Sequence, residues 1–369
     1  MTDFRSAIID LAAVGANLRR VREIVGDVKV LTVVKADAYG HGAVEVARTA
    51  VAAGADYLGT ADLDEALALR AAGIEAPILC WLHGPDVAFD EALDAGIEIG
   101  VSSASQLERV AAAASRGRPA VVQLKLETGL SRNGASENEW DALFARAQAL
   151  ESDGLLRVHG LFTHVSNTSP DEDRAALACF ERGIRLAAQA GLRPVLLHAA
   201  ATAAAIDLPE SRYDMIRLGV GLYGLSPFDD RTSADLGLVP VMRLSARVAA
   251  VRTVDAGAGV SYNYTYRTEA PTRLALVPLG YADGIPRHAS NRGPVWINGR
   301  RYTVAGRVAM DQFVVDVGSD EVAVGDEVVL FGAGRDGEPT ADDWAEAADT
   351  INYEIVTRIG PRVRKEYRS

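Results

Sequence analysis

Cysteine is scarce in this 369-residue sequence, and long apolar runs are absent from it. Cys80 and Cys179 are its two cysteines; both lie in apolar surroundings and nothing in their spacing suggests a disulfide, so we expect reduced, buried thiols. No apolar run approaches the roughly 20 residues that a membrane-spanning helix needs. The first residues also lack the basic segment and apolar stretch of a signal peptide. We therefore expect a cytoplasmic protein with no membrane partner.

Positive charge is also in deficit. The formal net charge of −12 at pH 7 disfavours nucleic acid as a partner and favours solubility. The chain is long enough for two domains with full cores, and no low-complexity segment, charge run or long linker separates them. We expect two domains that pack against each other.

The first two thirds of the chain repeat one unit: a short apolar strand, a loop and a helix. After a first strand at residues 4–9 and a helix capped by Asp10, the strand candidates are residues 31–34, 57–59, 77–81, 97–101, 120–126, 158–162, 194–197 and 213–218. Helical composition fills the stretches between them, such as residues 62–72, 103–115, 137–150 and 171–190. The unit count and length predict an α/β fold, a closed (β/α)8 TIM barrel over residues 10–236. The alternative, a doubly wound open sheet, lacks a G-x-G-x-x-G after a strand.

The composition changes near Gly237. Strand-like segments at residues 241–254, 272–279, 295–304, 308–317 and 328–331 are separated by short turns rich in Gly, Asp and Asn. One helix is expected at residues 340–350, and final strands follow up to Tyr367. Residues 237–369 are therefore predicted to form a mostly β C-terminal domain.

Lys35 occupies the position where active-site groups of such barrels gather. It ends the apolar strand at residues 31–34, and Gly40 and Gly42 let the following loop turn tightly. A lysine at the carboxyl end of a parallel strand points into the barrel mouth, where partial desolvation lowers the amine pKa and makes it a nucleophile. The plain alternative is a lysine whose ammonium reaches solvent at a strand end.

The sequence of residues 33–42, V-V-K-A-D-A-Y-G-H-G, resembles the pyridoxal-phosphate attachment motif of the alanine racemases. Further matching segments run to Tyr353, so the resemblance covers essentially the whole chain. It implies pyridoxal 5′-phosphate bound covalently to Lys35, and an N-terminal strand (residues 1–9) that packs with the C-terminal domain. It also implies a homodimer in which the C-terminal domain of one subunit covers the barrel of the other.

The resemblance assigns roles to residues at matching positions. The catalytic pair is Lys35 and Tyr262, the latter in G-V-S-Y-N at residues 259–263. Cofactor contacts are implied for Lys35, Tyr39, His164, Thr202, Arg217, Gly219, Val220 and Tyr353, substrate contacts for Arg132 and the Met310 backbone N–H, and supporting positions for Lys125, Tyr281 and Asp311. No metal is implied.

Three of these residues carry a particular chemistry. Arg132 suits the cofactor phenolate and the substrate carboxylate because a guanidinium is planar and permanently charged; a surface arginine on a loop is the alternative. Lys125 matches a position that is carbamylated in some members of the family; a plain lysine in the barrel wall is the alternative. Arg217 cannot accept the proton that an Asp would place on the pyridine nitrogen, which discourages transamination.

His164 follows an apolar strand, where a lone histidine is commonly a structural residue; in the family it contacts the arginine at position 217. We expect a cationic cluster including His164 and Arg217 to lower the pKa of Tyr262, because an ordinary phenol is a poor base at pH 7. Two departures from the family pattern are visible. Ala201-Thr202 replaces the usual Asn-Ser, and the segment at residues 165–170 leaves Asp171 and Asp173 as alternatives for the acidic residue of the entrance.

The sequence therefore predicts an amino-acid racemase that interconverts L- and D-alanine by a two-base mechanism and supplies D-alanine for peptidoglycan. Two rivals remain. A decarboxylase of the same fold needs a cysteine in its second domain, where this chain has none, and an acidic partner for the pyridine nitrogen, where it has Arg217. A non-catalytic pyridoxal-phosphate carrier would share the barrel alone. Serine or another small amino acid as the preferred substrate stays open.

Overall fold

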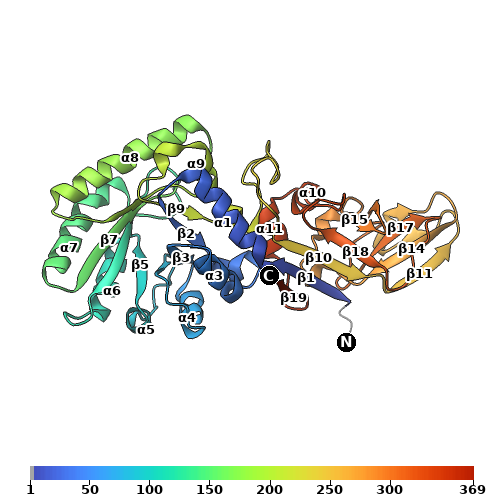
Figure 1. The fold of residues 1–369 in the computed structure, drawn as a ribbon, viewed down its shortest axis with the longest axis horizontal. Coiled ribbons are helices and arrows are strands. Elements are labelled where there is room, and N and C mark those ends of the chain that lie inside the picture. The colour runs from blue at the N-terminus through green and yellow to red at the C-terminus, as the bar shows by residue number, and fades with distance from the viewer. Residues whose placement is uncertain (1–3) are drawn as a thin grey trace.

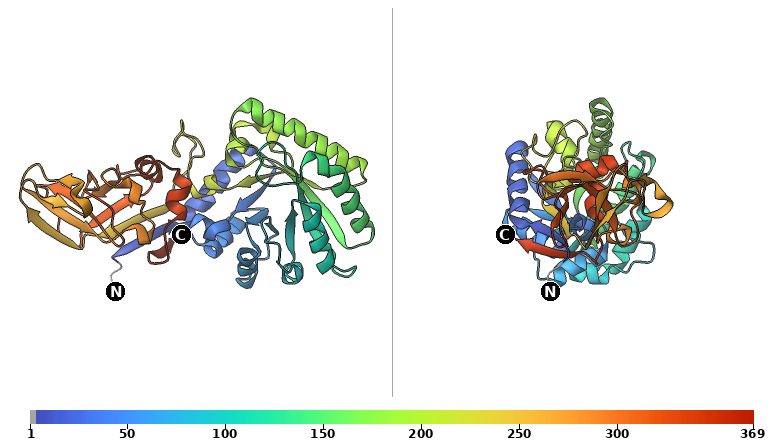
Figure 2. Two further views of the ribbon diagram at one scale, coloured as in Figure 1. Left: turned by 180° about the vertical axis from the view of Figure 1, so that it is seen from behind. Right: turned by 90° about the vertical axis from the view of Figure 1, so that its right-hand side faces the viewer.

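The structure is a computed structural model that describes residues 4–369. Two regions lie end to end along its longest axis, a barrel ringed by helices and a region built mainly from antiparallel strands (Figures 1 and 2). Within the described residues, no helix combines the length and the apolar content that crossing a bilayer requires.

The barrel consists of eight parallel strands. These are β2 (Lys29–Val33), β3 (Tyr57–Thr60), β4 (Ile78–Cys80), β5 (Ile97–Val101), β6 (Ala120–Lys125), β7 (Leu156–Phe162), β8 (Leu196–His198) and β9 (Met215–Leu218). The order in the sheet is β8-β7-β6-β5-β4-β3-β2-β9, and the Asp214 N–H donates to the Leu197 carbonyl (3.0 Å) where the two ends meet. The predicted (β/α)8 barrel is therefore confirmed as a nearly closed one.

Helices cover the outside of this barrel. They are α1 (Leu11–Val25), α3 (Ala43–Ala52), α4 (Leu63–Ala71), α5 (Asp90–Asp94), α6 (Ala104–Ala113), α7 (Trp140–Ser152), α8 (Pro170–Gln189) and α9 (Thr202–Asp207). Four of them begin where a short polar side chain accepts a hydrogen bond from a first-turn N–H: Asp10, Asp62, Ser103 and Ser169. The strands and helices expected from the sequence agree with these bounds to within a few residues.

The second region has three sheets, with orders β16-β15-β18-β10-β1-β19, β11-β14-β17 and β12-β13. Its strands are β1 (Arg5–Asp10), β10 (Met242–Arg247), β11 (Ala250–Val254), β12 (Gly259–Val260), β13 (Tyr266–Arg267), β14 (Thr272–Val277), β15 (Pro294–Ile297), β16 (Arg300–Thr303), β17 (Phe313–Gly318), β18 (Glu327–Phe331) and β19 (Arg364–Arg368). The N-terminal strand β1 pairs antiparallel with β10 and parallel with β19. The first element of the chain thus lies in the sheet of the last (Figure 1).

Four expectations for this region are wrong in detail. The segment predicted as one strand at residues 241–254 is divided into β10 and β11, which lie in different sheets, and the one at residues 295–304 is an antiparallel pair, β15 and β16. The helix predicted at residues 340–350 ends as α10 (Ala341–Ala347), because Asp349 adopts a positive φ of 51°, and a second helix, α11 (Asn352–Thr357), follows it. The strand predicted at residues 308–317 begins only at Phe313. The preceding backbone bonds elsewhere, since the Ala309 and Met310 carbonyls accept from the Tyr281 and Ala282 N–H groups (3.0 and 2.9 Å).

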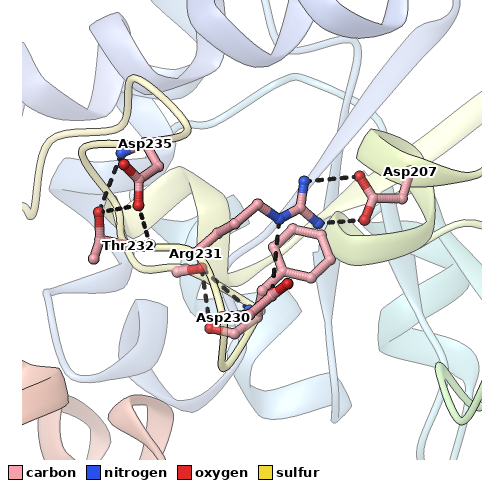
Figure 3. A network of polar contacts seen from close by, with 7 residues as sticks. Asp207, Asp230, Arg231, Thr232 and Asp235 are labelled. Carbon is pink, nitrogen blue, oxygen red and sulfur yellow. Dashed lines mark hydrogen bonds and ion pairs between the residues drawn. The ribbon is translucent and has the colours of Figure 1, made fainter.

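The segment at residues 226–240 joins the two regions and is tied back to the barrel (Figure 3). Arg231 forms an ion pair with Asp207 at the end of α9, and its guanidinium lies 3.6 Å from the centre of the Phe228 ring. Asp235 accepts hydrogen bonds from the Thr232 N–H (2.8 Å) and hydroxyl (2.7 Å), which closes the turn. Polar contacts therefore hold the connection against one face of the barrel.

Candidate functional site

A pocket of about 430 Å³ opens at the carboxyl ends of the barrel strands. Lys35 follows β2, Lys125 ends β6, Thr202 follows β8, and Arg217 lies in β9. The residues lining the pocket are Val33, Lys35, Ala36, Tyr39, Trp81, Lys125, Arg132, Phe162, His164, Asn167, Ala201, Thr202, Ala203, Arg217, Gly219, Val220, Pro227, Tyr353 and Thr357. Ten predicted site residues are among them.

Lys35 is presented by a left-handed turn that sequence reasoning missed. The short element α2 (Lys35–Tyr39) follows β2, and residues 36–39 have φ between 51° and 54°. L-residues in this conformation cost roughly 1–2 kcal/mol each, so the surrounding structure must hold the turn in place. We had expected a loop made possible by its glycines.

His41 supplies that support. Its Nδ1 lies 3.0 Å from the Ala38 carbonyl and 2.9 Å from the Tyr39 carbonyl, and because both oxygens only accept, Nδ1 donates. The fully buried imidazole also stacks on Tyr223, with ring centres 4.6 Å apart. Burial lowers the pKa of His41 to about 4, so the ring is neutral at pH 7.

Four cationic side chains share the pocket: Lys35, Lys125, Arg132 and Arg217. Among the residues that the structure describes, no Asp or Glu lines it. Burial and then repulsion by Arg132 lower the pKa of Lys35. Burial, followed by Arg217 and Arg132, lowers the pKa of Lys125 to about 8. Positive charge is therefore concentrated here although the chain as a whole is strongly acidic.

Arg217 is buried and makes its polar contacts with neutral groups. Its Nη2 donates to the carbonyls of Thr163 (2.7 Å) and Ala199 (2.8 Å) and to His164 Nδ1 (3.0 Å). Its Nη1 donates to His198 Nδ1 (2.9 Å). Burial and Arg132 lower the pKa of this guanidinium to about 9, which leaves it charged at neutral pH.

His164 does not add to the positive charge. Burial, and then repulsion by Arg217 and Arg132, lower its pKa to about 2, so the imidazole is neutral. The expected contact with Arg217 is present, but the expectation of a cationic cluster that includes His164 is wrong. The physical reason is that a proton on Nδ1 would face the guanidinium that donates to it.

Small residues and hydroxyls also line the pocket. Thr202 Oγ1 accepts from the N–H groups of Gly219 (3.2 Å) and Gly221 (3.4 Å). A Cβ at Gly219 would lie 2.8 Å from the Tyr39 hydroxyl, so only glycine leaves this space open. Burial raises the pKa of Tyr39 and raises that of Tyr353 to about 12, so both phenols stay protonated and can donate. Hydroxyls beside small residues suit a bound phosphate.

Comparison with known proteins identifies the family of this chain. Residues 9–227 match the family model described as alanine racemase, N-terminal domain, and residues 241–367 match the one described as alanine racemase, C-terminal domain. The chain belongs to the alanine racemase family. Alanine racemases of Thermobifida fusca and Streptomyces coelicolor are 48% and 51% identical to it. These matches cover 100% and 98% of this chain and 99% and 95% of the relatives.

Solved structures of the alanine racemase family agree. The crystal structure of alanine racemase from D-cycloserine producing Streptomyces lavendulae has a TM-score of 0.98 at 47% identity, covering 100% of this chain and 98% of that one. Alanine racemase from Streptomyces coelicolor gives 0.96 at 50% identity, covering 98% and 97%. The resemblance and the fold class expected from the sequence are therefore confirmed, and the chain is an enzyme.

The family's remaining candidate residues lie away from the pocket. Tyr262, Tyr281 and Met310 are 68%, 41% and 53% exposed, and none of them lines it. Asp311 also lies outside and forms an ion pair with Arg362 (2.6 Å). The sequence motifs located these residues on the C-terminal domain, but one chain does not bring them to Lys35.

Neither candidate for the entrance acid lines the pocket. The Asp171 side chain is almost fully exposed, whereas Asp173 is buried and accepts from the Asn167 N–H (3.0 Å). Asn167 itself reaches the pocket. Trp81 and Phe162 were missed because an aromatic residue at a strand end is indistinguishable from core by sequence pattern alone.

We predict that His41→Leu lowers the urea midpoint of unfolding, because two buried carbonyls lose their donor, at a cost of about 1–3 kcal/mol. The loss should shrink as the pH falls from 6 to 4. In that interval the histidine binds a proton in the unfolded wild-type chain, whereas in the folded chain, with its pKa of about 4, it stays largely unprotonated. The free energy of unfolding of the wild type therefore falls by up to about 1.4 kcal/mol for each pH unit that the pH decreases. Exposed His288, replaced by Leu, is the matched control. Equal midpoints for His41→Leu and wild type at pH 7 would contradict the role of His41.

Proposed function

We propose that this chain binds pyridoxal 5′-phosphate on Lys35 and interconverts L- and D-alanine there, with Tyr262 of a second copy as the other base. The observation that carries the proposal is the cationic pocket, in which four basic side chains and no acidic one meet at the mouth of the barrel in a chain of net charge −12. Such a pocket selects an anionic cofactor and a substrate carboxylate.

The residues present fit the cofactor. Lys35 would hold it covalently, and Thr202, Gly219, Val220, Tyr39 and Tyr353 would hold its phosphate through hydroxyls and backbone N–H groups. When bound, the cofactor supplies the electron sink that makes the α-proton of an amino acid removable.

Two arginines set the orientation within this arrangement. Arg132 would bind the phenolate and the substrate carboxylate as a charged fork. Arg217 would face the ring nitrogen. Because Arg217 contacts only neutral acceptors and keeps its charge, the pocket offers this nitrogen a donor and no carboxylate that could keep it protonated. An unprotonated ring nitrogen favours removal and return of the α-proton and disfavours transamination.

Inversion at carbon requires two bases on opposite faces, since a single base would mostly return the proton to the face it left. Lys35 suits one face because burial lowers the pKa of its amine. The phenols of Tyr39 and Tyr353 do not suit the other, because burial raises their pKa. We therefore look outside this pocket for a phenol that could act as the second base.

Tyr262 is the candidate for that base, donated across a homodimer with shared active sites. Tyr262, Tyr264, Tyr281 and Met310 are all exposed. The Ala282 N–H donates to the Met310 carbonyl (2.9 Å), and Ser261 donates to the Arg307 carbonyl (2.7 Å), which brings the three family segments together. Exposed tyrosines and a methionine are typical of an interface with a partner.

The proposal also covers the domain bounds, the cellular compartment and the biological role. We place the barrel domain at residues 10–236 and the domain contributed to the partner at residues 237–369. Of the N-terminal segment predicted at residues 1–9, residues 1–3 lie outside the described residues, and strand β1 packs with the second domain. Both thiols are free; Cys80 is buried as expected, whereas Cys179 is only partly buried, because its helix faces partly toward solvent. Free thiols favour a reducing cytoplasm, and D-alanine supply for peptidoglycan is the role that fits an alanine racemase there. A decarboxylase is disfavoured because neither cysteine lies in the C-terminal domain.

Borohydride reduction of the holoenzyme followed by tryptic mapping tests the attachment residue. We predict one phosphopyridoxyl group, carried by Lys35. The chain has only four lysines, so Lys29, Lys125 and Lys365 serve as internal controls and should stay unmodified. A Lys35→Arg variant treated identically should carry no adduct. A label on Lys125, or one that persists in the variant, would refute the attachment.

Lys125 is proposed to carry a carbamate that balances Arg132. Carbamate formation needs a neutral amine, and a pKa of about 8 leaves an appreciable neutral fraction at pH 7.5. We predict a carbamate resonance in ¹³C NMR spectra of the enzyme in ¹³C-bicarbonate that is lost in Lys125→Met and retained in Lys29→Met. Spectra of wild type and Lys125→Met that are identical would show an unmodified ammonium.

A further inference from the structure

A line of hydrogen-bonded side chains runs from Arg217 into the interior of the barrel. Arg217 Nη1 contacts His198 Nδ1 (2.9 Å), and His198 Nε2 contacts Gln123 Oε1 (2.7 Å). Gln123 Nε2 then contacts Glu98 Oε2 (2.6 Å). The line crosses from β9 through β8 and β6 to β5, and all four residues are buried. It leads from the pocket toward the amino ends of the strands.

The carboxylate at the far end is held by two further groups. Glu98 Oε1 lies 2.9 Å from His159 Nδ1 on β7 and 3.3 Å from the Tyr57 hydroxyl on β3. Its other oxygen is left for Gln123. Glu98 is therefore fixed from two sides before it contacts the amide.

The line has only one consistent set of donors and acceptors. A guanidinium only donates, so His198 Nδ1 must accept, and the proton of this neutral ring sits on Nε2. That N–H donates to the Gln123 carbonyl oxygen, which turns the amide NH2 toward Glu98. A carboxylate only accepts, so it closes the line. A cation at one end and an anion at the other thus determine every proton between them.

The surrounding residues restrict the positions of the Gln123 and His198 side chains. A Cβ at Gly160 would lie 2.8 Å from Gln123 Oε1, so the glycine in β7 admits the amide. Phe162 stacks on His198 with ring centres 4.9 Å apart and an angle of 1° between the planes. The imidazole cannot turn away from the line without losing that stack.

We propose that Glu98 is a positioning residue for Arg217: through Gln123 and His198 it fixes the Nε2–H form of His198, whose Nδ1 then holds the guanidinium in the pocket. This inference rests on the proposed role of Arg217 at the ring nitrogen. Without the carboxylate, the Gln123 amide can flip, and His198 can shift its proton to Nδ1. A donor would then face a donor, and Arg217 would lose its orientation.

The test is ¹⁵N NMR of histidine-labelled protein without cofactor, which reads the His198 tautomer directly. The chain has six histidines, so the His198 signals can be assigned with a His198→Gln variant. We expect Nε2 protonated and Nδ1 bare in wild type between pH 6 and 8. An imidazolium, or a proton on Nδ1, in wild type would overturn the proposal without any variant having to fold.

Glu98→Leu should mix the two tautomers and lower kcat of the holoenzyme about tenfold or more, with KM for alanine nearly unchanged. Glu98→Gln keeps an oxygen acceptor for the Gln123 amide. In this variant His198 should be protonated mainly on Nε2, and kcat should be close to the wild-type value. Exposed Glu108, replaced by Leu, is the control and should move neither.

A loss of kcat in Glu98→Leu with an unchanged His198 spectrum would overturn the proposal, as would wild-type values for both readouts. Failure of the proposed function is separable, because it would appear as wild-type protein that neither binds the cofactor nor racemises alanine. The tautomer measurement stands apart from that result.

Discussion

Unbalanced positive charge at the mouth of the barrel is the constraint on which the rest of the site depends. Arg217 is buried, and within residues 4–369 no Asp or Glu lines the pocket. Glu65 and Glu127 lie close enough to raise the pKa of Lys35 and of Lys125, but burial and the neighbouring arginines outweigh them. Burying a charge costs free energy unless its polar groups form hydrogen bonds. Arg217 meets this requirement because its N–H groups donate to backbone carbonyls and to two neutral imidazoles. On the proposed function, an anionic ligand would relieve the remaining imbalance. On that proposed function, the same positive charge would attract the carboxylate of an amino acid and an anionic cofactor, and burial lowers the pKa of Lys35.

The fold holds this charge in place by two different means. On one side a left-handed turn of L-residues aims Lys35, and the buried His41 ring keeps the turn closed by donating to its carbonyls. On the other side side-chain hydrogen bonds cross the barrel interior from Arg217 to Glu98. Both devices are buried and polar, so each is costly if a single partner is lost. The strained turn and the buried polar contacts therefore both adjoin the candidate site.

Much of this could be predicted from the sequence, and the limits have physical reasons. Apolar period and length located the barrel strands, and caps such as Asp10 located helix starts, because both are local signals. The left-handed turn at Lys35 was missed, since no single residue in it demands positive φ. The neutral state of His164 was also missed, because charge depends on what packs around the ring. Glu98 was overlooked for a similar reason. It lies in an apolar strand, and nothing in the sequence says that its side chain contacts the Gln123 amide, two residues before Lys125 of the pocket. The Tyr262 motif located this residue on the second domain, but the motif alone does not say whether one chain brings it to Lys35, and in this structure Tyr262 does not line the pocket.

The central claim is that a complete site needs Lys35 from one chain and Tyr262 from another, and subunit mixing tests it most directly. Lys35→Ala and Tyr262→Phe subunits, each inactive alone, are co-expressed with different affinity tags, and the mixed pairs are isolated by sequential purification. In a two-fold dimer each mixed pair has one site that lacks both groups and one that has both intact. The account predicts that the mixed pairs regain roughly half of wild-type racemase activity. Mixed pairs, verified by native mass spectrometry, that stay as inactive as their parents would contradict it.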